Sequence, residues 1–206
     1  MRSLVLPLLL AGCYEAPDLP LIDTVPIVAN NACDQDREGE VVCVIDGDTF
    51  DIGACGDELG ERVRMLGVAA PEVASPPNPA ECGAEAALQE LARLVEGQRV
   101  VLSFDEECVG IYGRTLAYVW LEGLAYDRVS GDPDVLELTR VRPGQSESGL
   151  LVNEWLIAQG YATLYPEDRF GELLFSAELN EAEFEAQAAG RGLWSDCLAA
   201  SGTTQP

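Results

Sequence analysis

The chain has 206 residues, of which 36 are acidic and 12 basic, so its net charge at neutral pH is −24. Apolar residues make up 48% of it, which is enough to bury a core and excludes a disordered acidic tail. Every basic residue is arginine and histidine is absent, which excludes catalysis by a histidine base and metal sites with imidazole ligands. The acidic balance also argues against a broad electrostatic surface for polyanions. Phosphate chemistry in this chain would therefore depend on a few arginines in defined positions.

The N-terminus has the features of an export signal. A single arginine precedes an apolar run that ends at Leu10 and is too short to span a bilayer. The sequence Leu10-Ala11-Gly12-Cys13 resembles a bacterial lipobox, in which the signal is cut before a cysteine that becomes lipidated. We expect a signal peptide over residues 1–12, a lipid anchor at Cys13 and a Pro- and Asp-rich tether over 13–38, with an ordinary secretory signal as the alternative. The location implied is the cell envelope, and the outer membrane in a Gram-negative source, because Tyr14 and not Asp follows the cysteine.

Six cysteines remain after Cys13, and an even number in an exported chain favours disulfides. Buried free thiols are the alternative. A metal cluster is a weaker interpretation, because no two of the six have the Cys-x-x-Cys spacing. The six are Cys33, Cys43, Cys55, Cys82, Cys108 and Cys197.

From Gly39 onward the pattern changes to short strand-like runs. Five strands are predicted, over residues 41–45, 49–52, 62–68, 99–104 and 115–121. An apolar stripe from Ala84 to Val95 predicts a helix after the third strand, and further helices are predicted over 151–159 and 171–189. This order predicts an α+β domain over residues 39–197, a five-stranded Greek-key barrel of the OB-fold type with three helices, followed by a tail over 198–206.

Four groups of charged residues lie in or beside these strands. Asp46-Gly47-Asp48 forms a tight break, Arg64 lies inside an apolar run, Glu72 follows the end of that run, and Arg114 precedes the fifth strand. Each has an ordinary structural explanation by itself, as a turn or as an arginine that extends to water. Together they supply a carboxylate for a hard cation, a carboxylate base and two guanidinium groups for phosphate charge. These are the parts that phosphodiester hydrolysis requires.

Six motifs in the same order resemble the staphylococcal nuclease (thermonuclease) family, over about residues 40 to 196. They are Val44-Ile45-Asp46-Gly47-Asp48-Thr49, Arg64-Met65-Leu66-Gly67-Val68-Ala69-Ala70-Pro71-Glu72, Cys82-Gly83-Ala84-Glu85-Ala86, Tyr112-Gly113-Arg114-Thr115-Leu116-Ala117-Tyr118, the stretch 151–162, and Gly192-Leu193-Trp194-Ser195. The resemblance implies a monomeric, calcium-dependent nuclease with a DNA or RNA substrate and the same OB-fold barrel with three helices. The implied site residues are Asp48 and the Ala70 carbonyl for Ca²⁺, Glu72 as general base or water-orienting group, Arg64 and Arg114 for phosphate, and Tyr112 and Tyr165 for substrate binding.

The sequence departs from the family pattern at three places. Ala69 stands where the family usually has a calcium-binding Asp, which implies weakened Ca²⁺ binding, and Ile111 stands where a basic residue is common. About 25 extra residues, near 124–150, predict a strand-containing extension with turns. The alternatives to an enzyme are an OB-fold binding module that has lost its metal site and a structural envelope protein. Because the family places the segments of Cys82 and Cys108 beside the active site, the resemblance favours a disulfide between these two.

Overall fold

The computed structural model describes residues 35–56, 60–129, 132–140, 149–165 and 173–197. The predicted signal peptide, the anchor at Cys13, most of the tether and the tail lie outside the described residues, as does Cys33. Within the described part of the chain, no helix is long and apolar enough to cross a bilayer.

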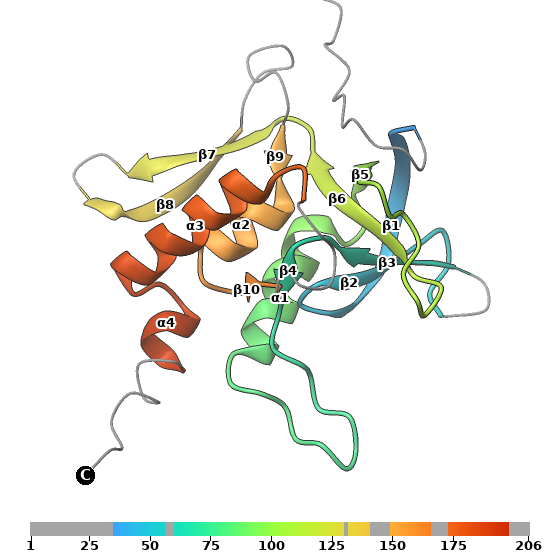
Figure 1. Ribbon diagram of the computed structural model, residues 1–206, viewed down its shortest axis with the longest axis horizontal. Helices are drawn as coiled ribbons and strands as arrows, with labels where there is room; N and C mark the ends of the chain where they lie inside the picture. The colour runs from blue at the N-terminus through green and yellow to red at the C-terminus, as the bar shows by residue number, and fades with distance from the viewer. Residues whose placement is uncertain (1–34, 57–59, 130–131, 141–148, 166–172, 198–206) are drawn as a thin grey trace, which may run out of the picture.

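The domain is built on a closed barrel of five strands (Figure 1). They are β1 (Arg37–Asp46), β2 (Thr49–Ile52), β3 (Glu61–Met65), β5 (Arg99–Ser103) and β6 (Thr115–Leu121). Their order is β3-β2-β1-β5-β6, and the short β9 (Leu150–Leu151) extends the sheet beyond β6. A parallel pairing between β3 and β6 closes the barrel, whereas the other four strand pairs are antiparallel. The predicted α+β barrel is confirmed.

Helices cover the barrel and complete its core. They are α1 (Ala84–Val95), α2 (Val152–Ala158), α3 (Ser176–Ala189) and the short α4 (Leu193–Asp196). The inward residues of the strands, such as Val41, Phe50 and Val119, form one cluster with apolar residues of α1, α2 and α3. Asn153 ties α2 to the barrel, because its buried side chain accepts a bond from the Val119 N–H and donates one to the Leu66 carbonyl. The three predicted helices are present, and α4 was not predicted.

The third predicted strand is two strands. β3 ends at Met65, and after a turn at Gly67 the strand β4 (Val68–Ala69) leaves the barrel to pair with β10 (Thr163–Leu164). Gly67 has a φ of +71°, and a Cβ there would lie 2.6 Å from the Leu179 side chain on α3. Only glycine allows both this backbone conformation and this close approach. The turn directs the residues after β4 toward the loop between β1 and β2.

The predicted extension is a hairpin of β7 (Leu124–Val129) and β8 (Asp132–Arg140), and it crosses the helical side of the domain (Figure 1). The Tyr126 hydroxyl donates a hydrogen bond to Glu154 on α2, and its ring lies 5.4 Å from that of Trp155. The Gln159 side chain donates to the Leu136 carbonyl over 3.2 Å. The extension is therefore packed on α2 as part of the fold.

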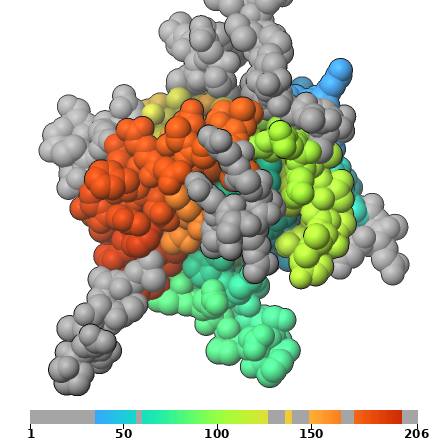
Figure 2. All heavy atoms as spheres, in the orientation of Figure 1, coloured from blue at the N-terminus to red at the C-terminus, as the bar shows by residue number. Residues whose placement is uncertain are grey.

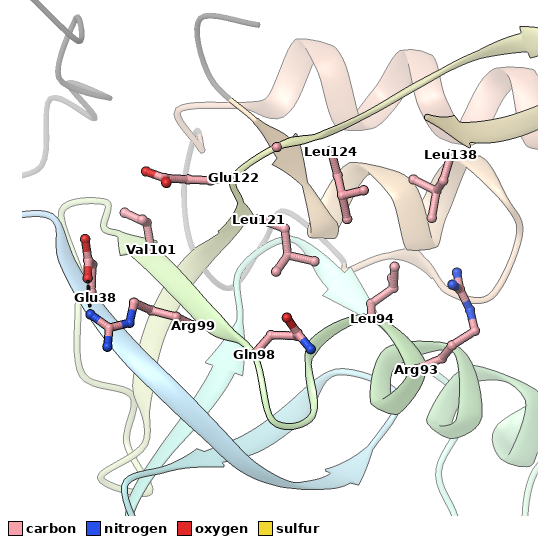
Figure 3. A pocket seen from close by; sticks show the side chains of 11 residues that line it. Glu38, Arg93, Leu94, Gln98, Arg99, Val101, Leu121, Glu122, Leu124 and Leu138 are labelled. Carbon is pink, nitrogen blue, oxygen red and sulfur yellow. Dashed lines mark hydrogen bonds and ion pairs between the residues drawn. The ribbon is translucent and has the colours of Figure 1, made fainter. Parts of the chain in front are cut away.

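A cavity of about 650 Å³ lies where this hairpin meets the barrel (Figure 3). Leucines line its interior, among them Leu94 and Leu138, whereas Glu38 and Arg99 form an ion pair beside it. None of the described residues that line it belongs to the predicted site.

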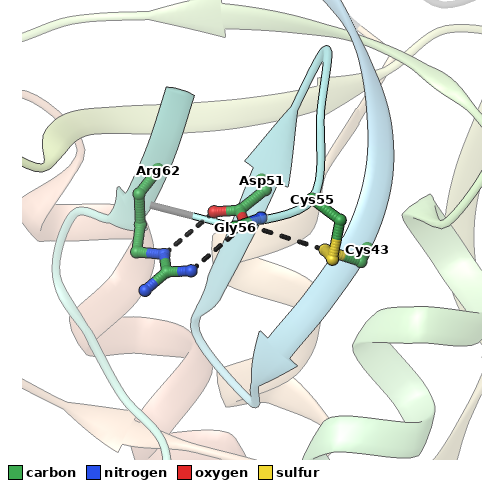
Figure 4. The surroundings of a disulfide bond; sticks show 5 residues. All are labelled: Cys43, Asp51, Cys55, Gly56 and Arg62. Carbon is green, nitrogen blue, oxygen red and sulfur yellow. Dashed lines mark hydrogen bonds and ion pairs between the residues drawn. A yellow bond between two sulfur atoms is a disulfide. The ribbon is translucent and has the colours of Figure 1, made fainter. Parts of the chain in front are cut away.

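Two disulfides are present among the described residues, Cys43–Cys55 and Cys82–Cys197. The predicted pair of Cys82 with Cys108 is wrong, because α4 brings Cys197 to the start of α1 while Cys108 lies in the segment that leads into β6. The first disulfide joins β1 to the loop after β2, beside the buried Asp51 (Figure 4).

Asp51 is itself held by three donors at that disulfide. Its carboxylate accepts bonds from the Arg62 guanidinium at 2.9 and 3.1 Å and from the Gly56 N–H at 2.8 Å (Figure 4). The hydrogen bond from Arg62, more than any other contact, lowers the pKa of Asp51. The disulfide and the ion pair together hold β1, β2 and β3 in register at this end of the barrel.

We expect the two disulfides to differ in their effect on stability. Cys82 and Cys197 are 115 residues apart in sequence, whereas Cys43 and Cys55 are 12 apart. Because a crosslink that closes a longer loop removes more entropy from the unfolded chain, serine replacement of both cysteines should cost about 5 kcal/mol for Cys82–Cys197 and about 3 kcal/mol for Cys43–Cys55. Urea unfolding of the two double variants measures this, and equal or reversed losses would contradict it.

Candidate active site

Asp48 lies at the centre of the predicted site. It lies in the turn between β1 and β2 and is 5% exposed, and its N–H donates to the Asp46 carboxylate over 3.1 Å. Its Oδ1 accepts a bond from the Thr49 hydroxyl at 2.9 Å. Its Oδ2 accepts the Ala70 N–H at 3.0 Å and lies 2.9 Å from Nη2 of Arg64. The structure thus brings together three of the predicted residues, Asp48, Arg64 and Ala70.

Small residues make this approach possible. A Cβ on Gly47 would lie 2.6 Å from the Cβ atoms of both Ala70 and Ala87. The absence of a side chain at Gly47 therefore lets the turn pack against α1 and against the segment after β4. This close packing is what buries the Asp48 carboxylate.

The Asp48 carboxyl has an unusual pKa. This pKa is raised from its ordinary 3.8 to about 7, chiefly by burial and in smaller part by the charge of Asp46, while the Arg64 guanidinium opposes the increase. Burial has the largest effect because it removes water from the charged form. A cation bound beside Asp48 would favour the ionised form.

This raised pKa predicts a pH dependence of stability. In the folded protein the Asp48 carboxyl keeps its proton up to about pH 7, whereas in the unfolded chain it loses the proton near pH 3.8. Asp48 therefore destabilises the fold increasingly as the pH rises from about 4 to 7. Above pH 7 the destabilisation stays constant. Asp48→Asn does not titrate. In metal-free buffer its free energy of unfolding, relative to the native chain, should rise by about 2 kcal/mol or more over that interval. Unfolding curves at several pH values measure this, and a constant difference would contradict it.

The two predicted phosphate-binding arginines each lie beside a tyrosine ring. The Arg64 guanidinium carbon is 5.5 Å from the ring centre of Tyr165, and that of Arg114 is 5.5 Å from the ring centre of Tyr112. Nη1 of Arg64 also donates to the Met65 carbonyl over 2.8 Å. The structure therefore places both predicted tyrosines at the predicted arginines.

The strand pairing that closes the barrel determines where Arg114 lies relative to Arg64. In the parallel pair of β3 and β6, Arg64 lies opposite Leu116, two positions after Arg114. Arg114 directly precedes the first residue of β6, Thr115, which pairs with Val63, so the register brings the backbone of Arg114 beside β3.

Glu72 lies two residues beyond Ala70, in the long loop that leads to α1. Its N–H donates to the Glu81 carboxylate over 3.0 Å, and its carbonyl accepts the Glu81 N–H at 2.9 Å. These two hydrogen bonds hold the backbone at Glu72 in place, whereas Glu72 as a whole is exposed to solvent. An exposed carboxylate on a fastened backbone is accessible to water and substrate.

The residues present fit a hard divalent cation. Carboxylate and carbonyl oxygens are the ligands that Ca²⁺ prefers, and Asp46, Asp48 and Ala70 lie on two segments joined by the Ala70 to Asp48 bond. Both oxygens of Asp48 already accept bonds from protein donors, and Nη2 of Arg64 lies 2.9 Å from Oδ2. The arrangement supports a cation with few protein ligands.

Sequence reasoning missed the role of Thr49. It forms part of the quoted Asp-Gly-Asp-Thr motif, yet only the structure shows that its hydroxyl orients Asp48. The signal in the sequence that could have predicted this role is a hydroxyl residue directly after a candidate metal-binding carboxylate.

The chain is similar to known nucleases in sequence. Residues 62–196 match the family described as "Staphylococcal nuclease homologue". The chain is 35% identical to Protein ParB from Escherichia coli, over 84% of this chain and 80% of that protein. It is 31% identical to the micrococcal nuclease from Shigella flexneri, over 78% and 75% of the two chains. It is 46% identical to the thermonuclease from Staphylococcus intermedius, but this match spans 38% of this chain and less than half, 45%, of that protein.

Proposed function

Because the chain belongs to the staphylococcal nuclease homologue family, we propose that it is a metal-dependent nuclease that hydrolyses phosphodiester bonds of DNA or RNA. The observation that carries this proposal is the contact of Asp48 with Arg64 and Ala70, which gathers an anionic oxygen site and a phosphate-binding group from distant segments. In this proposal Ca²⁺ is held by Asp48 and the Ala70 carbonyl, with weakened affinity because Ala69 offers no carboxylate.

The proposed roles of the other residues are those that the resemblance to the family implies. Arg64 and Arg114 bind the phosphate oxygens and stabilise the charge that develops on them. Glu72, on its exposed loop, orients a water molecule and takes its proton. A cation held by Asp48 and the Ala70 carbonyl would supply positive charge that offsets the charge of the phosphate. The contacts of Arg64 with the Asp48 carboxyl and the Met65 carbonyl fix the guanidinium before substrate arrives, which lowers the entropy lost on binding.

A cleavage assay on single-stranded DNA and on RNA tests the proposal. The purified domain should cleave in the presence of Ca²⁺, lose activity with a chelator and regain it on addition of excess Ca²⁺. Glu72→Gln keeps the shape of the side chain without the base, so it should lower the rate at saturating metal by about 10²-fold or more. Absence of cleavage with Ca²⁺, Mg²⁺ or Mn²⁺ would overturn the nuclease proposal.

A second candidate function is favoured by Ala69 and by the occupied oxygens of Asp48. If the metal site no longer works, the domain is a nucleic-acid or protein binding module that uses its two arginines and their tyrosines. Binding of DNA without cleavage, unaffected by chelator and reduced in Arg114→Ala, would support this alternative over the enzyme.

We further propose that the mature chain begins at a lipidated Cys13 and acts at the cell envelope. Leu10-Ala11-Gly12-Cys13 supports this, as does the even number of cysteines that remain after it. Mass spectrometry of the mature N-terminus should show an acylated cysteine, and an unmodified terminus at another residue would contradict the anchor.

A further inference from the structure

The segment before β6 is a tight hairpin that projects from the barrel. The Leu116 N–H donates to the Cys108 carbonyl over 2.9 Å and the Gly110 N–H to the Arg114 carbonyl over 2.8 Å. Gly113 closes the turn with a 2.9 Å bond to the Gly110 carbonyl and adopts a φ of +72°. The tip, Ile111 and Tyr112, is therefore held by backbone hydrogen bonds on both sides of the turn.

This tip is apolar and exposed. Ile111 is 90% exposed, Tyr112 77% and Val109 63%, so three of the five exposed large apolar residues in the described part of the chain lie in this hairpin. Figure 2 shows the yellow-green segment between β5 and β6 at the molecular surface. Large apolar side chains clustered in water usually mark a contact with a partner.

The hairpin belongs to the edge of the candidate active site. Arg114 lies at its base, and the Tyr112 ring is engaged with that guanidinium at 5.5 Å. Ile111 lies at the tip with nearly all of its surface in water. An isoleucine side chain has no donor or acceptor, so it can form a hydrogen bond with neither a phosphate nor a base edge. Its apolar surface can instead insert between two bases and contact their faces in place of base stacking.

We propose that Ile111 is a wedge that enters between adjacent stacked bases of duplex DNA next to the phosphate bound by Arg114. The proposal rests on the nuclease function proposed above and names duplex DNA as a substrate. Apolar side chains inserted at a base step unstack it and bend the duplex, and a rigid hairpin loses little entropy on insertion. In a chain with a net charge of −24, such a contact also supplies binding that does not depend on attraction between charges.

A lipid surface is the other partner that an apolar tip could contact. Insertion of the tip into a bilayer would press Tyr112 and Arg114 against lipid and block the site that they border. Contact with the substrate of that site uses all three residues at once, so the position of the hairpin favours DNA.

The test uses a duplex that carries 2-aminopurine, whose fluorescence increases when it is unstacked, at a different step in each of a series of oligonucleotides. Binding is measured in a Glu72→Gln background with Ca²⁺, where cleavage is slow. The wild-type hairpin should raise the fluorescence at one step, and Ile111→Ser should reduce that increase at least fivefold. Phe184→Ser is the matched control, because Phe184 is also exposed (71%) but lies on α3, and it should leave the increase unchanged.

A cleavage measurement complements the binding test. With Glu72 intact, Ile111→Ser should lower cleavage of duplex DNA about five- to tenfold and change cleavage of single-stranded DNA less than twofold. If Ile111→Ser cleaves both substrates like the wild type and keeps the fluorescence increase, the wedge is wrong while the nuclease function stands. If no variant cleaves but the increase still depends on Ile111, the nuclease function fails and the wedge stands. Binding to anionic vesicles that requires Ile111, without any increase on duplex DNA, would overturn the wedge in favour of a membrane contact.

Discussion

Arg114→Lys is expected to lower the rate of phosphodiester cleavage by about 10²- to 10³-fold at saturating Ca²⁺. The substitution keeps the positive charge but replaces a planar fork of donors by a single ammonium group, which cannot bind two phosphate oxygens in fixed geometry. It also weakens the stacked contact with Tyr112, whose ring centre lies 5.5 Å from the guanidinium carbon. Steady-state cleavage of DNA as a function of substrate and Ca²⁺ concentration measures the effect, which should fall mainly on kcat.

The matched control is Arg99→Lys. The Arg99 side chain is 74% exposed and pairs with Glu38 on the neighbouring strand, at the cavity between the hairpin and the barrel. Its replacement by lysine should change the cleavage rate by less than twofold. Comparable rates for the Arg114 variant and the control would remove Arg114 from the catalytic machinery.

Ala69→Asp is expected to lower the Ca²⁺ concentration required for half-maximal cleavage by about tenfold or more. The next residue, Ala70, donates its N–H to Asp48 at 3.0 Å, so a carboxylate at position 69 would add a second anionic ligand close to Asp48. Affinity for Ca²⁺ rises with the number and charge of its oxygen ligands. Turnover at saturating Ca²⁺ should change much less, because Glu72 and the arginines are already present.

The same substitution should destabilise the metal-free fold by about 1–2 kcal/mol, because two carboxylates in one buried site repel each other. Ca²⁺ should restore the lost stability, which thermal unfolding with and without the ion measures independently of cleavage. Ala69→Asn supplies a neutral oxygen of similar size and should give a much smaller effect on both quantities. A metal dependence unchanged by Ala69→Asp would show that position 69 does not face the cation.

The sequence by itself determined most of the strands and the three longer helices, because strand and helix patterns are local. Alternation in runs such as 49–52 and the apolar stripe of α1 are set by which side chains must face one core. It also determined which residues to examine at the site, since Asp48, Arg64, Glu72 and Arg114 are charged residues in or beside apolar runs. The extension was predicted as strand-containing for the same local reason, and it is the hairpin of β7 and β8.

Only the tertiary structure decided which distant segments meet. The third apolar run was predicted as one strand, because nothing in its composition shows that Gly67 must turn against Leu179 of α3. Cys82 pairs with Cys197, 115 residues away, because the helices pack their ends together, which no local pattern encodes. The contact of Arg64 with Asp48 likewise depends on strand pairing between β2 and β3. Burial of Asp48, and with it the pKa of about 7, results from close packing around Gly47, a property of the assembled fold.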